Sequence, residues 1–351
     1  MVTIFTPSFA DEADTNAQNL SVKEIVARLD PARIAVTMFH EGAVDQRIAT
    51  RANTKLLRWR ARGNTLRAIW EILTRVPDVY FFPREGPLDA AVLTLRRALG
   101  LKTAVVSHVV SGGLYSNSYP PARVRNVREA DAVFANNSYL SDLVREKLGR
   151  EAATIHNGID RRYFFPAADG REPGDHITVL YAGSFRPYKR VPMVVRDAAR
   201  HPEVRFWVAG VGEEEQICKK LAEELRCENV EFLGHLRPAQ LGDEMRRADV
   251  FYFPSILEGH PQVLGQAAAC GLPSVAMDIY RPDYVISGTT GFLAASDVEL
   301  SEKLDLLIHR PELRRSMGEA ARVHSQKFDW DVIARKWQDI FEQAAARRRN
   351  H

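Results

Sequence analysis

The stretch VFYFPSILEGHPQVLGQAAACGLPSVAM, residues 250–277, decides the fold class. Its first four residues, Val250–Phe253, are β-branched or aromatic and predict a buried strand, whereas the alanine-rich run after Pro261 predicts a helix. Pro273–Met277 then predicts a second strand. A strand, a helix and a strand in this order form a βαβ unit with a parallel sheet. The stretch therefore predicts an α/β protein.

The same alternation of strands and helices continues along almost the whole chain. The expected strands are Val2–Thr6, Ile34–Phe39, Val79–Phe82, Thr103–Ser107, Ala132–Ala135, Ala153–His156, Ile177–Tyr181, Val204–Ala209, Val230–Phe232, Val250–Phe253 and Pro273–Met277. Ligands of such sheets bind beyond the carboxyl ends of the strands, so the loops that follow the strands are where binding residues are sought.

One interruption divides this series. The segment AADGREPGDH, residues 167–176, is rich in glycine, proline and charge and poor in large apolar residues. We therefore expect two Rossmann-like domains, 1–168 and 176–330, joined by a linker over 169–175. The sequence FDWDVIARKWQDIFEQ then predicts a last amphipathic helix, so that 331–351 form a helix and tail.

Composition excludes several classes of protein. The chain has 351 residues, 45% hydrophobic and 26% charged, which excludes wholesale disorder and fits about two domains at roughly 150 residues each. Lysine and arginine (48) barely exceed aspartate and glutamate (45), so no nucleic-acid partner is expected. No apolar run approaches the ~18 residues of a membrane span, and no secretory signal is evident. Three cysteines without a CxxC pair favour a reducing, cytoplasmic location.

The stretch VAGVGEEE, residues 208–215, half matches the dinucleotide-binding pattern GxGxxG. Three carboxylates crowd the place that a pyrophosphate would occupy, and like charges repel each other. A tight turn between a strand and a helix is therefore favoured, and a Rossmann oxidoreductase is not expected.

Asp329-Trp330-Asp331 has the DxD spacing of some metal-bound nucleotide sites. The motif lies between two expected helices, where either aspartate suits a helix N-cap better than a ligand role. The ten histidines show no metal-ligand spacing, so no metal site is expected.

The loop and helix start at 258–266 favour an anion-binding site. Gly259 lets the backbone approach a ligand closely, and Pro261 suits the first helical turn, where its missing N–H is not needed. Free N–H groups and the helix dipole then fit a phosphate. A carboxylate at Glu258 makes sense beside that anion only if it accepts hydrogen bonds from hydroxyls, as on a sugar. The candidate ligand-binding residues of this segment are Gly259, His260, Pro261, Gln262, Val263 and Gln266.

The turn GSFRPYKR, residues 183–190, supplies the other half of the candidate site. It begins with Gly183 after the first strand of the second domain, where the carboxyl ends of neighbouring strands converge. Lys189 can neutralise a diphosphate as a point charge, and Arg186 or Arg190 can do so through two hydrogen bonds. The alternative is that these cations only solvate the start of a helix.

These motifs, in this order, resemble a known family over most of the chain from Asp131 onward. The matching segments are ADAVFANNSYLSDLV, TIHNGIDRRYFFP, YAGSFRPYKR, VEFLGHL, ADVFYFPS, EGHPQVLGQAAACGLPSVA, TTGFLAA, HRPELRRSMGEAAR and the final FDW helix. The set resembles the nucleotide-sugar half of retaining GT-B glycosyltransferases, specifically glycosyltransferase family four. The resemblance implies two Rossmann-like domains that face each other across a cleft, with a C-terminal helix that crosses back to the first domain. The first 100 residues match only in general pattern.

The resemblance implies roles for individual residues. Glu258 matches the first glutamate of the family's E-x7-E motif, which contacts the donor sugar, and Gln266 stands where the second glutamate binds ribose. Lys189 matches the diphosphate-binding lysine, while Ser184 stands where the family has an arginine. His108 resembles a first-domain histidine that faces the donor sugar, although a strand-end histidine without a role is the alternative. The catalytic candidates are thus Glu258, Lys189 and His108.

Three departures from the family pattern bear on activity. Gln266 lacks the charge of the family's second glutamate but can still form hydrogen bonds. Ser184 lacks the cation of the family's arginine, and Arg186, two residues away, is placed to supply one. The glycine loop after the first strand is absent. An acidic loop in its place is expected to face the acceptor, with Asp14 or Asn16 binding hydroxyls.

The expected function is retaining transfer of a sugar from a nucleotide-diphosphate donor to a glycan, lipid-linked or small-molecule acceptor, without a metal or other cofactor. A nucleoside diphosphate is a good leaving group, so charge stabilisation by Lys189 and by the helix start at Pro261 can replace a strong general acid. The alternative is a GT-B-like sugar-nucleotide-binding or partner subunit that has lost catalytic activity. The missing glycine loop, Ser184 and Gln266 would then be consequences of that loss.

Residues 46–70 contain seven cations and no aspartate or glutamate: Arg47, Arg51, Lys55, Arg58, Arg60, Arg62 and Arg67. Five of them recur at helical spacing beside an apolar stripe, which predicts one basic amphipathic helix that ends at Gly63-Asn64. Such a helix can bind an anionic membrane, and peripheral association with the inner face of a membrane is expected on that basis. The alternative is a solvated basic face, or one that binds an acidic acceptor.

Overall fold

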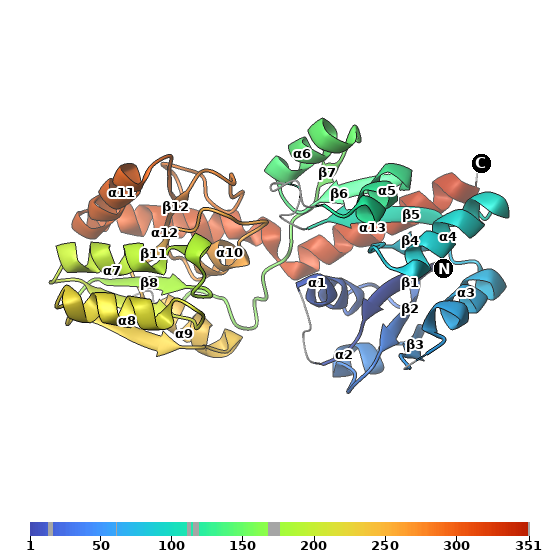
Figure 1. Cartoon of the computed structure of the whole chain (residues 1–351), viewed down its shortest axis with the longest axis horizontal. Coiled ribbons are helices and arrows are strands. Elements are labelled where there is room, and N and C mark those ends of the chain that lie inside the picture. Colours follow the sequence, from blue (N-terminus) through green and yellow to red (C-terminus); the bar gives the residue numbers. More distant parts are fainter. Residues whose placement is uncertain (13–16, 61, 111–113, 115–118, 168–175, 350–351) are drawn as a thin grey trace. The chain divides into compact units, whose positions relative to one another are not determined.

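The computed structural model describes residues 1–12, 17–60, 62–110, 114, 119–167 and 176–349. They form two compact units, each built on a parallel sheet with helices (Figure 1). Unit 1 comprises Met1–Gly158 and Trp330–His351, and unit 2 comprises Ile159–Asp329. The predicted α/β class with two Rossmann-like units is therefore confirmed.

Unit 1 contains a seven-stranded sheet in the order β3-β2-β1-β4-β5-β6-β7, and all neighbouring strands pair in parallel. The strands are β1 (Val2–Phe9), β2 (Ile34–His40), β3 (Thr54–Arg58), β4 (Val79–Phe81), β5 (Ala104–Val109), β6 (Ala132–Ala135) and β7 (Ala153–Thr154). The chain leaves β1 toward β2 and β3 on one side and returns to β4 on the other. Ligands of parallel sheets bind at such a reversal of strand order.

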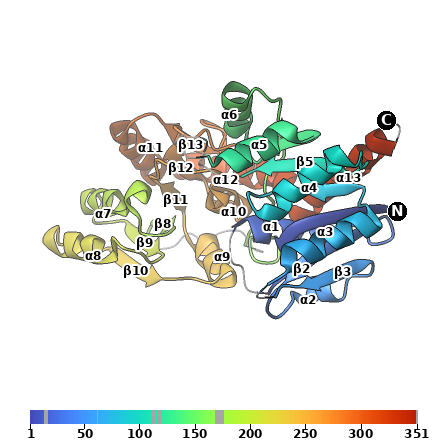
Figure 2. The same ribbon diagram turned by 45° about the vertical axis from the view of Figure 1, so that its right-hand side comes forward.

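Helices cover both faces of this sheet. They are α1 (Ala17–Val26), α2 (Gln46–Ala49), α3 (Asn64–Arg75), α4 (Pro87–Ala98), α5 (Pro121–Glu129), α6 (Ser138–Leu148) and α13 (Trp330–Arg349). Successive strand residues point to opposite faces, so Ile4 joins the core with α1 and α13, whereas Phe5 joins the core with α3 to α6. Figure 2 shows β2 and β3 next to each other with α3 alongside.

The last helix, α13, belongs to unit 1, although it follows unit 2 in the sequence. Trp337 and Phe341 are fully buried, and their ring centroids lie 4.9 and 4.8 Å from that of Phe81 on β4. A Cβ atom at Gly158 would lie only 2.2 Å from the Trp330 ring, so this glycine lets the helix start against the chain. The predicted return of the C-terminal helix to the first domain is confirmed (Figure 1, red helix).

Unit 1 ends at Gly158 rather than at residue 168, because the next residues pack into unit 2. The Ile159 N–H donates to the Phe328 carbonyl at 2.7 Å, and Phe164 is buried in the unit 2 core. The Tyr163 carbonyl accepts a hydrogen bond from Arg246 at 3.0 Å. The expected linker, 169–175, lies outside the described residues.

Unit 2 contains a six-stranded parallel sheet in the order β10-β9-β8-β11-β12-β13. The strands are β8 (Thr178–Ala182), β9 (Arg205–Ala209), β10 (Val230–Gly234), β11 (Val250–Phe253), β12 (Ser274–Met277) and β13 (Gly291–Ala294). The helices are η2 (Pro187–Lys189), α7 (Val191–Arg200), α8 (Glu215–Glu224), α9 (Pro238–Arg247), α10 (Gln262–Ala269), α11 (Asp297–His309), α12 (Pro311–Ser325) and η3 (Gln326–Phe328). Here the strand order reverses between β8 and β11.

The prediction of a single basic helix within 46–62 is wrong. The segment instead forms the short helix α2 and the strand β3, which pairs with β2 from Val36–Thr54 to His40–Arg58. Asn53, with a φ of 55°, separates the two elements, because a helix cannot continue through a left-handed residue. Leu57 is buried in the core with α3 to α6, so it determines which face of β3 points inward.

The cations of this segment do not share one face, because three of them take separate partners. Arg47 binds Glu24 at 2.7 Å, Arg51 donates to the Ile34 carbonyl at 2.8 Å, and Lys55 binds Glu71 at 2.5 Å. The basic amphipathic face that motivated membrane binding is therefore not formed. Within the described ranges, no helix combines the length and apolar character that crossing a bilayer requires.

Candidate donor-binding site

Two loops meet at the carboxyl ends of β8 and β11, the neighbouring strands between which the order of the unit 2 sheet reverses. The first loop follows β8 and carries residues 183–190, and the second follows β11 and carries residues 254–261. They are joined by the Ile256 N–H, which donates to the Tyr188 carbonyl at 2.9 Å. The structure thus brings together the two motifs that the sequence separates by about seventy residues.

The centre of this arrangement is an ion pair. Lys189 Nζ lies 2.5 Å from Glu258 Oε1, and the two side chains are only 14% and 11% exposed. Ser255, which is fully buried, donates its hydroxyl to the same carboxylate oxygen at 2.5 Å. The Lys189 ammonium also lies 5.0 Å from the centre of the Phe253 ring. Charge-assisted hydrogen bonds of this kind are short and strong, so they hold both loops in a fixed geometry.

The start of α10 lies next to Glu258 in the second loop. Helix α10 begins at Gln262, so Pro261 is its N-cap residue rather than part of the first turn. The cap residue makes no side-chain hydrogen bond, and in the described part of the chain the N–H groups of Gln262 and Val263 have no acceptor. Amide groups at a helix start, together with the dipole, favour an anion.

Helix α10 packs closely at this end. The His260 ring lies 4.3 Å from the Tyr284 ring, edge to face, and a Cβ atom at Gly265 would lie 2.7 Å from the Tyr284 ring. Gln266 is half-buried one turn after Gln262, so the two amide side chains share a helix face. The helix therefore presents two amides on the side of its open N-terminus.

The other cations of the first loop lie in different surroundings. Arg186 is exposed, and its side chain has no partner among the described residues; Ser184 beside it is also exposed. Arg190 binds Asp297 and lines a cavity of about 690 Å³ beside α7 and α11, which includes neither Lys189 nor Glu258. Of the three candidate cations, Lys189 alone contacts the second loop.

Glycines bring the loops after β8 and β9 into contact. A Cβ atom at Gly210, whose φ is 133°, would lie 1.9 Å from the Gly183 carbonyl oxygen. The Gly183 N–H also donates to the Ala209 carbonyl at 3.0 Å, and the Phe185 N–H donates to the Val211 carbonyl at 3.0 Å. Residues 208–215 therefore serve as a tight turn that packs against the first loop, as the carboxylates in the stretch suggest.

Tyr280 is a site residue that sequence reasoning missed. Its side chain is 2% exposed, and its hydroxyl has no hydrogen-bond partner among the described residues. Burial raises the pKa of this phenol, and the nearby Glu258 carboxylate raises it further, so the group is a neutral hydrogen-bond donor. Tyr280 follows β12, the neighbour of β11, and only the strand order reveals its proximity to Glu258.

Residues 167–324 match the sequence profile of the family described as glycosyl transferases group 1. This part of the chain belongs to the group 1 glycosyltransferases. The D-inositol 3-phosphate glycosyltransferase of Streptomyces scabiei is 30% identical over 257 residues, which cover 64% of this chain and 57% of that protein. The chain thus spans less than two thirds of the length of the curated relatives that it matches first.

Solved structures extend the likeness to the whole chain. Sucrose-phosphate synthase from Thermosynechococcus elongatus has a TM-score of 0.79 at 20% identity, covering 99% of this chain and 100% of that one. Anabaena HepE, solved with UDP and glucose, has a TM-score of 0.73 at 18% identity, covering 98% and 100%. At these identities the likeness shows the fold, and the GT-B glycosyltransferase fold expected from the sequence is confirmed.

His108 lies on β5 of unit 1, outside the group 1 glycosyltransferase segment. Its ring is 3% exposed and lies 5.2 Å from the Phe82 ring and 5.0 Å from the Trp337 ring. Burial lowers the pKa of His108 to about 3, because neither ring nitrogen has a hydrogen-bond partner among the described residues that would offset the lost hydration. The imidazole is therefore neutral, and its contacts are those of a core side chain. The acceptor-side candidates Asp14 and Asn16 lie outside the described residues.

Arg84 is a second residue that sequence reasoning missed. It follows β4, and its guanidinium donates to the Ser8 hydroxyl on β1 at 3.4 Å and to the Asn19 side chain. Burial lowers the pKa of Arg84, and no carboxylate lies within ion-pair distance of it among the described residues. A half-buried cation whose hydrogen-bond partners are neutral thus marks the strand-order reversal of unit 1, as Lys189 marks the reversal of unit 2.

The two carboxylates of the DxD motif lie beside arginines in different units. Asp329 Oδ2 lies 3.8 Å from Arg161 in unit 2, and Asp331 on α13 accepts a hydrogen bond from Arg28 at 2.8 Å in unit 1. Each carboxylate thus has a cation beside it, which favours the structural interpretation of the motif.

Proposed function

We propose that the protein transfers a sugar from a nucleoside diphosphate donor to an acceptor hydroxyl, with retention of the anomeric configuration. The observation that carries the proposal is the Lys189–Glu258 pair at the strand-order reversal of a group 1 glycosyltransferase segment. The fold likeness to HepE, whose structure contains UDP and glucose, supports the donor class.

The donor is proposed to lie across the two loops of unit 2. Lys189 and the open N–H groups of Gln262 and Val263 would bind the diphosphate, with Arg186 as a second cation. Glu258 would accept hydrogen bonds from sugar hydroxyls, and the Tyr280 hydroxyl would donate one. Further donor contacts are proposed for Gly183, Ser184, Gly259, His260, Pro261 and Gln266, the last with the ribose.

The reaction requires no strong acid in this proposal. The bond between the anomeric carbon and the β-phosphate oxygen breaks, and negative charge develops on the phosphate, where Lys189 and the α10 amides stabilise it. The acceptor oxygen forms the new bond on the face that the phosphate leaves. Its proton passes to the departing phosphate oxygen, so charge and protons balance without a metal or other cofactor.

We propose an anionic acceptor that binds unit 1 near Arg84. Arg84 is half-buried, and Asp89 and Glu85 offset its charge only without direct contact, so a bound phosphate or carboxylate would compensate the guanidinium further. The name of the relative from Streptomyces scabiei, D-inositol 3-phosphate glycosyltransferase, supports a phosphate-bearing acceptor. Inositol phosphate and inositol form a matched acceptor pair. Arg84→Gln should abolish any preference for the phosphorylated member, whereas Arg84→Lys should retain part of it.

The test of the donor reaction is nucleotide release from a panel of sugar nucleotides, with and without simple acceptors. Release that depends on both donor and acceptor supports the proposal, and NMR of the product decides whether the anomeric configuration is retained. Tight donor binding without turnover for any acceptor would favour the alternative of a sugar-nucleotide-binding subunit. If no sugar nucleotide binds, both the transferase function and the alternative of a binding subunit are contradicted.

The location is proposed to be the cytoplasm. The odd number of cysteines and the missing CxxC pair support a reducing compartment. Labelling of the thiols in intact cells, compared with labelling after lysis, would test this location.

A further inference from the structure

The solvent side of α3 in unit 1 carries an apolar stripe. Leu66, Trp70 and Leu73 are 73%, 67% and 37% exposed, and their spacing of four and three residues places them on one helix face. The opposite face packs on the sheet through Ala68 and Ile72, which are buried. Helix α3 is therefore apolar on both sides, and the outer side has no partner within the described residues of this chain.

Cations adjoin the stripe at its amino-terminal end. Arg60 and Arg62, which directly precede α3, are exposed, and among the described residues neither side chain has a partner. They precede the first turn of α3, which contains no acidic residue. Arginines at a helix N-terminus oppose the helix dipole, so their position does not serve the stability of α3.

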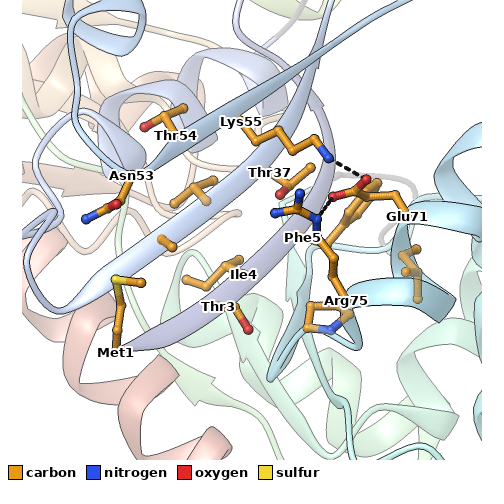
Figure 3. Close-up of a pocket in the computed structure, with 14 residues that line it drawn as sticks. Met1, Thr3, Ile4, Phe5, Thr37, Asn53, Thr54, Lys55, Glu71 and Arg75 are labelled. Carbon is orange, nitrogen blue, oxygen red and sulfur yellow. Dashed lines mark hydrogen bonds and ion pairs between the residues drawn. The ribbon is translucent and has the colours of Figure 1, made fainter.

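The one carboxylate of α3 is turned away from this face. Glu71 is 5% exposed and bonds Lys55 at 2.5 Å and Arg75 at 3.0 Å, and Figure 3 shows both cations directed at it. The three groups line a cavity of about 350 Å³ that also borders Thr37 on β2. The outer side of α3 thus presents aromatic and aliphatic groups next to positive charge, without a compensating carboxylate of its own.

We propose that this surface, the α3 patch (Leu66, Trp70 and Leu73 with Arg60 and Arg62), binds the anionic surface of a lipid bilayer. Arginines are attracted to anionic headgroups, and apolar side chains beside them can enter the boundary between headgroups and acyl chains. Tryptophan suits that boundary because its ring is apolar and its N–H is polar.

A second copy of the chain is a poorer occupant. Two copies related by a two-fold axis place the same patch against itself, so their arginines would face each other without carboxylates between them. The patch differs from the helix expected over 46–62, and it lies in a different unit from the donor site. Membrane binding by this patch therefore does not depend on the proposed reaction.

The experiment is sedimentation of the full-length protein with phosphatidylcholine vesicles and with mixed phosphatidylcholine–phosphatidylglycerol vesicles. We expect binding to the mixed vesicles only, and its loss at raised salt. The double variant Arg60→Gln/Arg62→Gln should weaken binding about tenfold or more, because each surface cation contributes separately. Leu66→Ser/Trp70→Ser should weaken binding to the mixed vesicles even at low salt, where the charge attraction is intact.

Matched controls and a second measurement complete the test. Leu99→Ser removes another exposed apolar side chain of unit 1, which is 57% exposed, and Arg315→Gln removes an exposed cation of unit 2; neither should change binding. Light scattering reports the oligomeric state without lipid. Three outcomes would each overturn the proposal. The wild type could fail to bind the vesicles, or both double variants could bind them as the wild type does. The wild type could also be a dimer that dissociates in Leu66→Ser/Trp70→Ser.

Discussion

Lys189 Nζ and Glu258 Oε1 lie 2.5 Å apart, so two groups proposed to bind different parts of the donor bind each other. A diphosphate that reaches Lys189 therefore competes with a carboxylate already in contact, and sugar hydroxyls compete with the ammonium for Glu258. The pair keeps both charges compensated when the donor is absent. In the proposed reaction it would also couple recognition of the phosphate to recognition of the sugar.

Lys189→Ala and Glu258→Ala should each lower the transfer rate by about two orders of magnitude or more. Each removes one contact with developing charge or with sugar hydroxyls, and such a loss typically costs about 3 kcal/mol. Steady-state nucleotide release measures the effect, with circular dichroism to show that the fold persists and Arg315→Gln as a surface control. Near-native turnover in either variant would remove the assignment.

Glu258→Gln should change nucleotide binding and transfer in opposite directions. Without the carboxylate, Lys189 loses its competing anion, so a nucleoside diphosphate should bind more tightly while sugar transfer falls. Calorimetric titration with the free nucleotide and rate measurement with the sugar nucleotide separate the two effects. Weaker nucleotide binding would mean that Glu258 holds Lys189 in place rather than competing for it.

Gln266→Glu should keep or improve nucleotide affinity, if the amide occupies a ribose-binding position. A carboxylate accepts hydrogen bonds from hydroxyls at least as well as an amide does. Gln262→Glu is the matched control, because a carboxylate one turn nearer the open helix start should repel the diphosphate. A large loss of affinity in Gln266→Glu, measured by calorimetry, would show a different role.

Tyr280→Phe should weaken donor binding about fivefold to tenfold without lowering the free energy of unfolding. The hydroxyl has no hydrogen-bond partner among the described residues, so its removal costs the folded protein nothing, while a bond to donor would be lost. Donor titration and chemical denaturation measure the two quantities. A clear loss of stability with unchanged affinity would contradict the donor role.

His108 should make unit 1 less stable in mild acid. Its pKa is about 3 in the folded protein against 6.5 when unfolded, so below pH 6.5 the unfolded chain binds a proton that the folded chain does not. The contribution is negligible at pH 7 and reaches about 2 kcal/mol of lost stability at pH 5. His108→Phe, which keeps an aromatic ring between Phe82 and Trp337, should remove this pH dependence from the unfolding curve. An unchanged pH dependence would show that the imidazole is solvated in the native state.

The alternation of strands and helices, and the two loops at 183–190 and 254–261, could be predicted because each depends on local pattern. Short β-branched runs fix the strands, and in a parallel sheet the loops that follow neighbouring strands lie at the same edge. The proximity of Tyr280 and Arg84 to their sites could not be predicted, because it depends on which strands are neighbours.

The segment 46–62 shows where periodicity misleads. Arginines and lysines four residues apart fit a helix, but in the folded chain the same spacing runs through α2, a left-handed Asn53 and the strand β3. The deciding interactions are long-range: Arg47 with Glu24, and Leu57 in the core against other elements. Neither partner is visible in a local window of sequence.

The position of α13 has a consequence for the order of events during synthesis. Trp337 and Phe341 fill the core of unit 1, yet they leave the ribosome after every residue of unit 2. Domains generally fold as units while the chain emerges. Unit 1 must therefore wait with part of one face of its sheet, the part that α1 does not cover, exposed until unit 2 has been made. The part of the chain translated first is thus expected to finish folding last.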